Sequence, residues 1–261
     1  MKKILVSILV LFYMFASSGL VFAASIGSTI PNAEQEGIGL SIGVEDNFIF
    51  ERKIEKNGNI TGGKVENSNE TYAMAILQPV NFMTIYGKVG AANLEEEFNW
   101  DINRDQKIKF DYGVVAGGGV NLIYNFGNNF GIGWDNQATW SHNEADSISG
   151  DNSPRLTSKG SVNNLNGRST IYAKYDFNLQ ESGILTPYLG CSYLFARSDI
   201  DKDIQVTDDT NIVYTYGDAE NKDNFGVVAG LNYKVGKNLS LGLEGRFIAE
   251  TAITGNVSYK F

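Results

Sequence analysis

The only histidine, His142, is the first residue to consider for catalysis, because histidine is the side chain most often used as a general base. Such a base needs a nucleophile or an acidic partner within hydrogen-bond reach. The two residues before it are Trp140 and Ser141, so there is no aspartate two positions ahead of it. In an extended strand Ser141 would point to the opposite face. The sequence gives little support for hydrolytic chemistry at His142.

Two acidic segments have spacing that could suit a divalent cation. Calcium loops supply oxygen ligands from alternate positions, and such positions carry Asp101, Asn103 and Asp105 in one segment and Asp199, Asp201 and Asp203 in the other. The sixth positions hold Gln106 and Ile204 where calcium loops have glycine, and neither segment has the closing glutamate. We expect solvated acidic loop tips here, and no metal or other cofactor is assigned.

A larger set of charged residues alternates with apolar residues along the chain. Acids and bases are nearly matched in this set, which comprises Glu45, Lys88, Asp111, Asp135, Arg168, Lys174, Asp176, Lys234, Glu244 and Arg246. An unpaired charge in a low-dielectric interior is costly, whereas paired charges with further hydrogen bonds are tolerated. If this parity lines an interior, the pattern predicts a network of ion pairs.

The elements that must position these residues are β-strands. Apolar residues recur at every second position, for example at Ile253, Val257, Tyr259 and Phe261, and a period of two is that of a strand. The same alternation predicts about ten strands, at residues 36–50, 69–78, 83–96, 109–125, 129–142, 165–179, 185–198, 223–235, 239–249 and 251–261.

The connections between these strands alternate in length. Short turns are expected at 79–82, 126–129, 180–184 and 236–238, and long polar loops at 51–68, 97–108, 143–164 and 199–222. This arrangement places the short turns and both termini on one side, as in transmembrane barrels with short periplasmic turns and long extracellular loops. A soluble barrel with an apolar interior has the same alternation, so other features must decide between the two.

The N-terminus carries an export signal. Lys2 and Lys3 precede a short apolar run, and Val21, Phe22 and Ala23 form the best cleavage site. About a dozen apolar residues are too few for a spanning helix, which needs about 20. We therefore expect a signal peptide at 1–23, a short periplasmic segment at 24–35 and a barrel at 36–261. Cys191 is the only cysteine, so the exported chain has no internal disulfide.

Composition excludes several other classes. The net charge is −9 and no basic cluster is present, so nucleic acid is not an expected partner. The chain contains 29 glycines and only 4 prolines, which suits strands joined by turns in one large β domain.

The C-terminal strand ends on Phe261 with Tyr259 two residues before it. Together with "TIYGKVGAA" and "YLGCSYLF", this end resembles the small outer-membrane protein β-barrel domain family of the OmpA, OmpX and opacity type. The resemblance implies that the barrel-assembly machinery reads the terminal strand through Tyr259 and Phe261. Many members have eight strands, so eight is the alternative to the ten counted here.

The sequence thus predicts an all-β, closed antiparallel barrel in a Gram-negative-type outer membrane, in contact with lipid and lipopolysaccharide. The role we expect is structural or adhesin-like, with a ligand bound by the extracellular loops. A barrel of about ten strands is close to the size that side chains fill, which favours a plugged lumen. A small passive porin-like channel is the alternative. An omptin-like protease using His142 is a distant third, and nothing else suggests an enzyme.

Overall fold

The computed structural model describes residues 26–31, 38–56, 60–100, 104–127, 129–150, 155–158, 160–200, 205–207, 213–215 and 218–261. The expected signal peptide lies outside these residues, as do Asp101, Asn103, Asp201 and Asp203 of the two acidic segments. Within the described part of the chain, no helix is long and apolar enough to cross a membrane.

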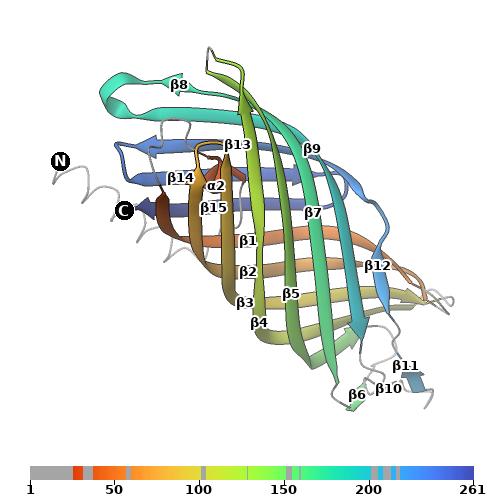
Figure 1. Ribbon diagram of the computed structural model, residues 1–261. Helices are drawn as coiled ribbons and strands as arrows, with labels where there is room; N and C mark the ends of the chain where they lie inside the picture. The colour runs from red at the N-terminus through yellow and green to blue at the C-terminus, as the bar shows by residue number, and fades with distance from the viewer. Residues whose placement is uncertain are drawn as a thin grey trace.

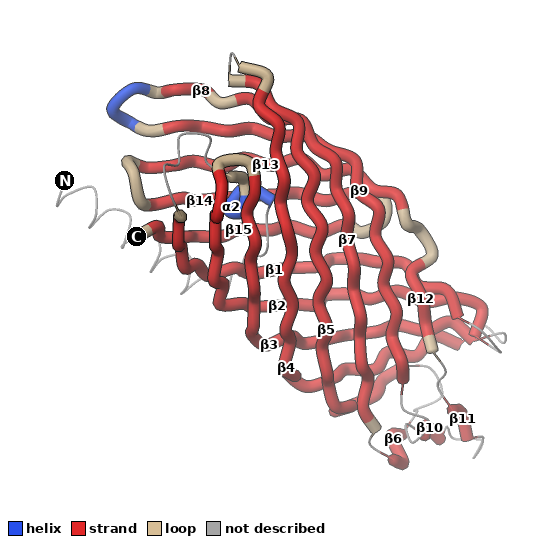
Figure 2. Tube along the Cα trace, in the orientation of Figure 1, coloured by secondary structure: helices blue, strands red, loops and turns tan. Residues whose placement is uncertain are grey.

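Ten long antiparallel strands form a closed ring (Figures 1 and 2). They are β1 (Gly39–Lys56), β2 (Ile60–Val80), β3 (Met83–Trp100), β4 (Arg104–Asn125), β5 (Phe130–Gly150), β7 (Ser161–Tyr175), β9 (Ile184–Ile200), β13 (Phe225–Val235), β14 (Leu239–Phe247) and β15 (Thr251–Lys260). Each pairs with the next along the chain, and β15 pairs with β1 to close the ring. The prediction of an all-β antiparallel barrel is confirmed.

Several short elements complete the structure. Strands β8 (Phe177–Asn178) and β12 (Ala219–Asn221) bring the main sheet to twelve strands. A separate sheet contains β6 (Arg155–Ser158), β10 (Gln205–Thr207) and β11 (Val213–Thr215). The helix α2 (Ile26–Thr29) precedes the barrel, and the single 3₁₀ turn η1 (Gln180–Ser182) joins β8 to β9.

The short turns lie at one end of the barrel. The β2–β3, β4–β5, β8–β9 and β13–β14 connections gather there, beside the C-terminus (Figure 1). At the opposite end the strands continue where the sequence predicted long loops. Residues 51–56, 60–68, 97–100, 104–108, 143–150 and 161–164 belong to strands, which corrects the loop boundaries expected at 51–68, 97–108 and 143–164. These outer parts of the strands are rich in polar residues because they face water, and the sequence pattern therefore predicted loops there.

Strand length separates a membrane-spanning part from an outer extension. A transmembrane strand needs about 9–11 residues, and β13, β14 and β15 have 11, 9 and 10. In contrast, β1 to β5 have 18, 21, 18, 22 and 21 residues. The long strands therefore continue well past the level at which the β14–β15 hairpin ends.

The ring narrows in this outer extension. Above the β14–β15 hairpin, β12 takes the place of three strands, because it pairs with β1 through Ile54↔Asn221 and with β9 through Ala219↔Ser198. The barrel thus has ten strands at the base and eight in the extension: β1, β2, β3, β4, β5, β7, β9 and β12. An eight-stranded barrel is just wide enough for side chains to fill its interior.

Bulges mark the transition between the two parts. In β1 the register shifts between Ile49 and Glu51, and in β4 it shifts between Phe110 and Val114. A bulge places two consecutive residues on the same face, and both Asp111 and Tyr112 are exposed. Asp111 was predicted to line the interior, and this shift is the reason why it does not.

The outward face changes character at the same level. Around the base it carries exposed apolar residues such as Val44, Ile171 and Leu189, with aromatic residues at both borders, which is the lipid-facing band of an outer-membrane barrel. Above the β1 bulge the outward residues become Glu51, Lys53 and Glu55. Charged residues on a lipid face are destabilising, so the extension stands outside the membrane.

The inward-facing residues also differ between the two parts, and a large apolar cluster lies inside the extension. Every strand of the eight-stranded extension contributes to one buried apolar cluster, formed by Ile54, Val65, Leu94, Phe98, Ile108, Phe110, Ala145, Val162, Ile200 and Ala219. Phe98, Ile108 and Val162 are 0% exposed. The extension is therefore packed around an apolar cluster, whereas most of the buried charged side chains lie in the membrane part.

Candidate functional site

The N-terminal segment lies inside the base of the barrel. The backbone nitrogen of Ile26 donates to Oε2 of Glu244 at 2.9 Å, and Nδ2 of Asn121 donates to Oγ1 of Thr29 at 3.0 Å. Ile26 and Ile30 are buried against an apolar cluster of Ile123, Tyr172, Tyr188 and Val228. Residues 26–31 therefore fill the lumen, where the sequence predicted a periplasmic segment. Their apolar side chains are shielded from water there.

Three tyrosines in the lumen lie flat across glycines of the neighbouring strand. The cross-strand pairs are Tyr86↔Gly119, Tyr172↔Gly133 and Tyr188↔Gly230. A Cβ added at these glycines would come within 2.5, 2.2 and 2.2 Å of the tyrosine ring or hydroxyl. The missing side chain thus makes room for each ring, and the hydroxyls reach across to buried acceptors.

Charged residues occupy the middle of the lumen. Nζ of Lys88 lies 3.0 Å from Oε1 of Glu45, and the two side chains are 2% and 1% exposed. Lys88 also donates to Oε1 of Gln137 at 3.0 Å. Asp135, which is 0% exposed, accepts hydrogen bonds from Tyr86 and Gln137 at 3.0–3.2 Å. Residues predicted to line the lumen on different strands are therefore neighbours here.

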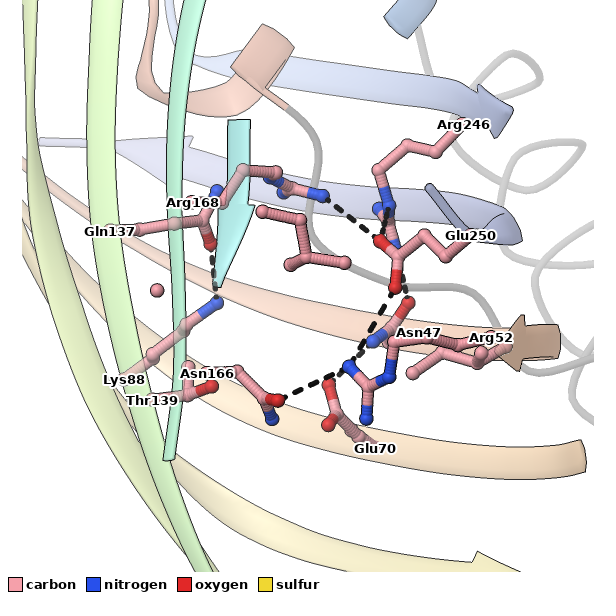
Figure 3. Close-up of a pocket in the computed structure, with 13 residues that line it drawn as sticks. Asn47, Arg52, Glu70, Lys88, Gln137, Thr139, Asn166, Arg168, Arg246 and Glu250 are labelled. Atoms are coloured by element: carbon pink, nitrogen blue, oxygen red, sulfur yellow. Dashed lines mark hydrogen bonds and ion pairs between the residues drawn. The ribbon is translucent and has the colours of Figure 1, made fainter. Parts of the chain in front are cut away.

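Glu250 is surrounded by three arginines, with which it forms ion pairs (Figure 3). Its Oε1 accepts from Nε of Arg246 at 2.6 Å and lies 3.6 Å from Nη1 of Arg168, while its Oε2 lies 3.8 Å from Nη1 of Arg52. Glu244 is the second acid, 3.3 Å from Arg246 and 3.7 Å from Arg168. These five residues, here called the arginine–glutamate cluster, are all at least nine-tenths buried as side chains.

Two members of this cluster are not among the lumen residues predicted from the sequence. Arg52 falls in the stretch 51–68 that was expected to be a loop, and Glu250 falls in the short connection between the last two strands. In the structure, the β1 bulge directs Arg52 into the lumen. Glu250 lies in the β14–β15 turn, and its side chain also points into the lumen. The signal available in the sequence was a lone acid in an otherwise apolar hairpin turn.

The remaining charges of the predicted set lie nearer the periplasmic mouth. Lys174 is buried and forms an ion pair with Asp176, which also accepts from Thr186 at 2.7 Å. Lys234 is half-buried and lines a separate cavity at the mouth.

A cavity of about 40 Å³ lies beside the arginine–glutamate cluster, bordered by Arg52, Arg168, Lys88 and Glu70. The Nε atoms of Arg52 and Arg168 are buried without a hydrogen-bond partner among the described residues. A buried donor left unsatisfied is costly, and a water needs about 10–15 Å³ of such space. The cavity can therefore hold a few waters that bridge the two guanidinium groups.

His142 and Cys191 face away from the lumen. The ring of His142 stacks on Trp140 with centroids 6.2 Å apart, and its Nδ1 lies 2.9 Å from Oδ1 of Asn163. Cys191 is exposed on the apolar outer face of β9. Among the described residues, no group of three histidine, cysteine or acidic side chains could hold a metal ion.

The outer wall of the extension carries a ladder of ion pairs across β2, β3 and β4. Lys107 lies 2.8 Å from Glu95 and 3.0 Å from Glu66, and Lys109 lies 3.3 Å from Glu95. Hydrogen bonds to Glu95 and Glu66 raise the pKa of Lys107. A hydrogen bond from Lys64 holds the pKa of Glu66 below its usual value. These charges lie where water and ions reach them.

The predicted assembly signal lies at the lipid-facing end of β15. Tyr259 and Phe261 are 49% and 68% exposed, and their rings are in edge contact with centroids 5.6 Å apart. The backbone nitrogen of Phe261 donates to the carbonyl of Leu40, so the last residue is still tied to β1. Both rings therefore belong to the aromatic border at the short-turn end.

The closed ring, the apolar outer band and the polar, filled lumen define an outer-membrane β-barrel. Residues 88–246 match the family described as the autotransporter beta-domain, which covers more than half of the chain. The chain belongs to this family. The family assignment replaces the resemblance to the OmpA, OmpX and opacity type, which is not supported.

Several solved structures are similar to this chain in outline. The translocator domain of the autotransporter NalP from Neisseria meningitidis has 12% identity and a TM-score of 0.47, covering 88% of this chain and 90% of that one. The beta domain of the Bordetella autotransporter BrkA has 9% identity and a TM-score of 0.44, covering 87% and 99%. The outer membrane protease OmpT from Escherichia coli has 10% identity and a TM-score of 0.42, covering 88% and 97%. No match is found among curated protein sequences.

Membership in this family places the chain in the outer membrane, as predicted. The short turns then face the periplasm and the extension faces the cell exterior.

Proposed function

We propose that this chain is a non-conducting, non-catalytic outer-membrane barrel that carries an interaction surface on its outer extension. The single observation that supports a sealed barrel is the apolar cluster inside the extension, to which all eight strands contribute. The apolar side chains fill most of this narrow cross-section, and polar groups buried beside them, such as Glu96 and Ser198, hydrogen-bond to one another, so little space is left for a hydrated ion. Below it, the arginine–glutamate cluster and residues 26–31 fill the lumen.

The extension supports the second half of the proposal. Strands of 18–22 residues exceed the span of a membrane by about 8–12 residues, which corresponds to about 20–30 Å above the membrane once strand tilt is allowed for. Its wall is polar and carries the ion-pair ladder of Lys64, Glu66, Glu95 and Lys107. A rigid, hydrated extension of this kind holds its tip above the membrane surface, where a partner can reach it.

Planar-bilayer recording of the refolded mature chain tests the sealed state. We expect no discrete conductance steps from protein whose insertion is verified by its heat-dependent gel mobility. Reproducible steps would instead support a small passive channel, and Phe98→Ala should then enlarge them because Phe98 lies in the narrow layer.

Surface binding is tested separately by displaying the chain on cells that do not adhere. We expect displayed chain to increase binding to at least one class of matrix protein or surface glycan. Equal binding by cells displaying the chain and by cells carrying the empty vector, across such a panel, would contradict the interaction role.

Family membership favours a second candidate, passage of a polypeptide through the barrel. An epitope inserted after Ala23 separates the two candidates. If the barrel is sealed, the epitope stays inaccessible to antibody on intact cells. Surface detection of the epitope, with a periplasmic protein undetected in the same cells, would favour translocation.

A further inference from the structure

The lipid-facing wall of β5 carries an amide in its middle. Asn136 shares its outward face with Trp134 and Trp140, which are 47% and 45% exposed. It lies midway along the strand between Phe130, where β5 begins, and His142. A transmembrane strand has about 9–11 residues, so Asn136 lies near the centre of the hydrocarbon layer.

Other polar side chains on the outward face have partners within the chain. Asp46 accepts a hydrogen bond from Oγ1 of Thr71 at 2.8 Å, and Ser169 accepts one from Nε1 of Trp134 at 2.9 Å. In contrast, the side chain of Asn136 makes no hydrogen bond to any of the described residues, although Ser169 lies directly opposite it on β7. Lipid tails offer neither a donor nor an acceptor, so an amide that faces them is left unsatisfied.

Small residues lie beside this amide in a row across four strands. The row runs through β3, β4, β5 and β7 and consists of the cross-strand neighbours Gly87, Gly118, Ala138 and Gly167. A Cβ added at Gly87 would meet no atom within 4 Å, and one added at Gly167 would meet a single atom at 4.0 Å. No side chain in the row is larger than a methyl group, so another protein wall can come close to the backbone here, as small residues allow between transmembrane helices.

We propose that this face is the contact between two copies of the chain in the membrane, with Asn136 of each copy paired to its counterpart. A carboxamide has two donors and an acceptor, so two such groups related by a two-fold axis satisfy each other through reciprocal hydrogen bonds. A second copy inserted in the same orientation presents its amide at the same depth, which a lipid tail cannot do. The ring is closed and has no free strand edge, so the second copy must meet it through side chains.

Energy transfer between labelled copies in bilayers tests the proposal. The mature chain with Cys191→Ser and Asn81→Cys, a position exposed in the β2–β3 turn, is labelled with a donor or an acceptor fluorophore and reconstituted as a mixture in phosphatidylcholine vesicles. We expect energy transfer above the level of random proximity that persists as lipid is added, because a specific dimer separates only on strong dilution. Heat-dependent gel mobility verifies the insertion of each variant.

Two substitutions on the contact face separate amide pairing from close approach. Asn136→Leu removes the amide and leaves a side chain that suits lipid. Gly87→Leu adds bulk to the row at a position where a Cβ meets no atom within 4 Å. We expect each substitution to weaken the dimer by about tenfold or more. Ala229→Leu is the matched control, because it adds bulk to the lipid-facing wall of β13, on the far side of the ring from β3.

Disulfide cross-linking locates the contact. In the Cys191→Ser background, Ala138→Cys should give a cross-linked dimer on oxidation, because Ala138 lies beside Asn136 on the same face, whereas Ala229→Cys should not. Monomers at every lipid ratio would overturn the proposal and indicate a lipid or another protein as the occupant of this face. The proposal also fails if Asn136→Leu leaves the dimer unchanged, or if Ala229→Leu weakens it to the same extent.

Discussion

The Oε1 atom of Glu250 accepts a hydrogen bond from Nε of Arg246 at 2.6 Å, and the two residues stand at opposite ends of one hairpin turn. Arg246 is the second-to-last residue of β14, and Glu250 immediately precedes β15. The turn between them includes Ile248 at φ +81°, a backbone conformation that is costly for a β-branched residue. The hairpin accepts this strain while placing one acid among three arginines.

Replacing this acid is the first prediction. Glu250→Gln leaves Arg52, Arg168 and Arg246 with one remaining acid, Glu244, and breaking a buried ion pair typically costs about 3–5 kcal/mol. We expect the free energy of unfolding, from urea titration in detergent or bilayer, to fall by about that amount. Asp199→Asn is the control, because its pair with Arg197 is exposed to solvent and should contribute little to stability. Equal losses in both variants would contradict the role of the buried cluster.

The apolar cluster of the extension gives the second prediction. Phe98 is 0% exposed at its centre, and Phe98→Ala should lower the free energy of unfolding by about 3–5 kcal/mol through lost burial and the remaining cavity. Tyr112→Ala removes an aromatic residue that is 66% exposed at the bulge and should cost clearly less. If the two substitutions have the same effect, the extension is not packed around Phe98.

The tyrosine–glycine pairs give the third prediction. In Gly230→Ala, the new Cβ would lie 2.2 Å from Cζ of Tyr188, so the ring must move and its 3.0 Å hydrogen bond to Glu244 is lost. Overpacking of this kind costs about 1–3 kcal/mol. Gly87→Ala is the matched control, because no atom lies within 4 Å of the added Cβ. Urea titration of both variants measures the difference, and an unaffected Gly230→Ala would show that Tyr188 does not need the glycine.

The ion-pair ladder gives the fourth prediction, on pH and salt. The lowered pKa of Glu66 means that its contribution to stability is present above the unfolded pKa and is lost as pH falls through the folded one. The raised pKa of Lys107 means that its contribution is present below the unfolded pKa and is lost as pH rises through the folded one. The ladder should therefore stabilise the chain most from about pH 5 to pH 10.

The variant Lys107→Met measures this contribution by urea titration. At pH 7 and low salt we expect a loss of at most about 1 kcal/mol, because the pairs are partly exposed to solvent. The difference from the unaltered chain should shrink at pH 3 and in about 1 M salt, where the pairs are neutralised or screened. Lys53→Met is the control on β1, and a Lys107 effect that persists at pH 3 would point to packing instead of charge.

The period of two along each strand was sufficient to predict an outer-membrane barrel and most of its interior. Glu45, Lys88, Asp135 and Arg168 alternate with apolar residues in the sequence, and the structure has each of them on the lumen side. This was possible because side chains alternate between the two faces of a strand without bulges, so the sequence alone shows which face each residue lies on.

The prediction of which residues point into the lumen was wrong wherever a bulge shifted the strand register. Asp111 was assigned to the lumen, yet the β4 bulge exposes it, and Arg52 was assigned to a loop, yet the β1 bulge turns it inward. One extra residue in a strand exchanges its two faces, and no local pattern marks that residue clearly. The long loops were mistaken for the same reason, since polar residues suit both a loop and the outer wall of a hydrated barrel.

By itself, the sequence determined the class of fold, the side of the membrane for the short turns and the apolar band, because these depend on local alternation. Only the tertiary structure decided that Glu250 meets Arg52 and Arg168, that Ile26 contacts Glu244, and that the ring narrows from ten strands to eight. These contacts join residues far apart in the chain, and their geometry follows from strand register and from β12 replacing three neighbours. Register is a property of pairs of strands, so it becomes visible only when the ring is closed.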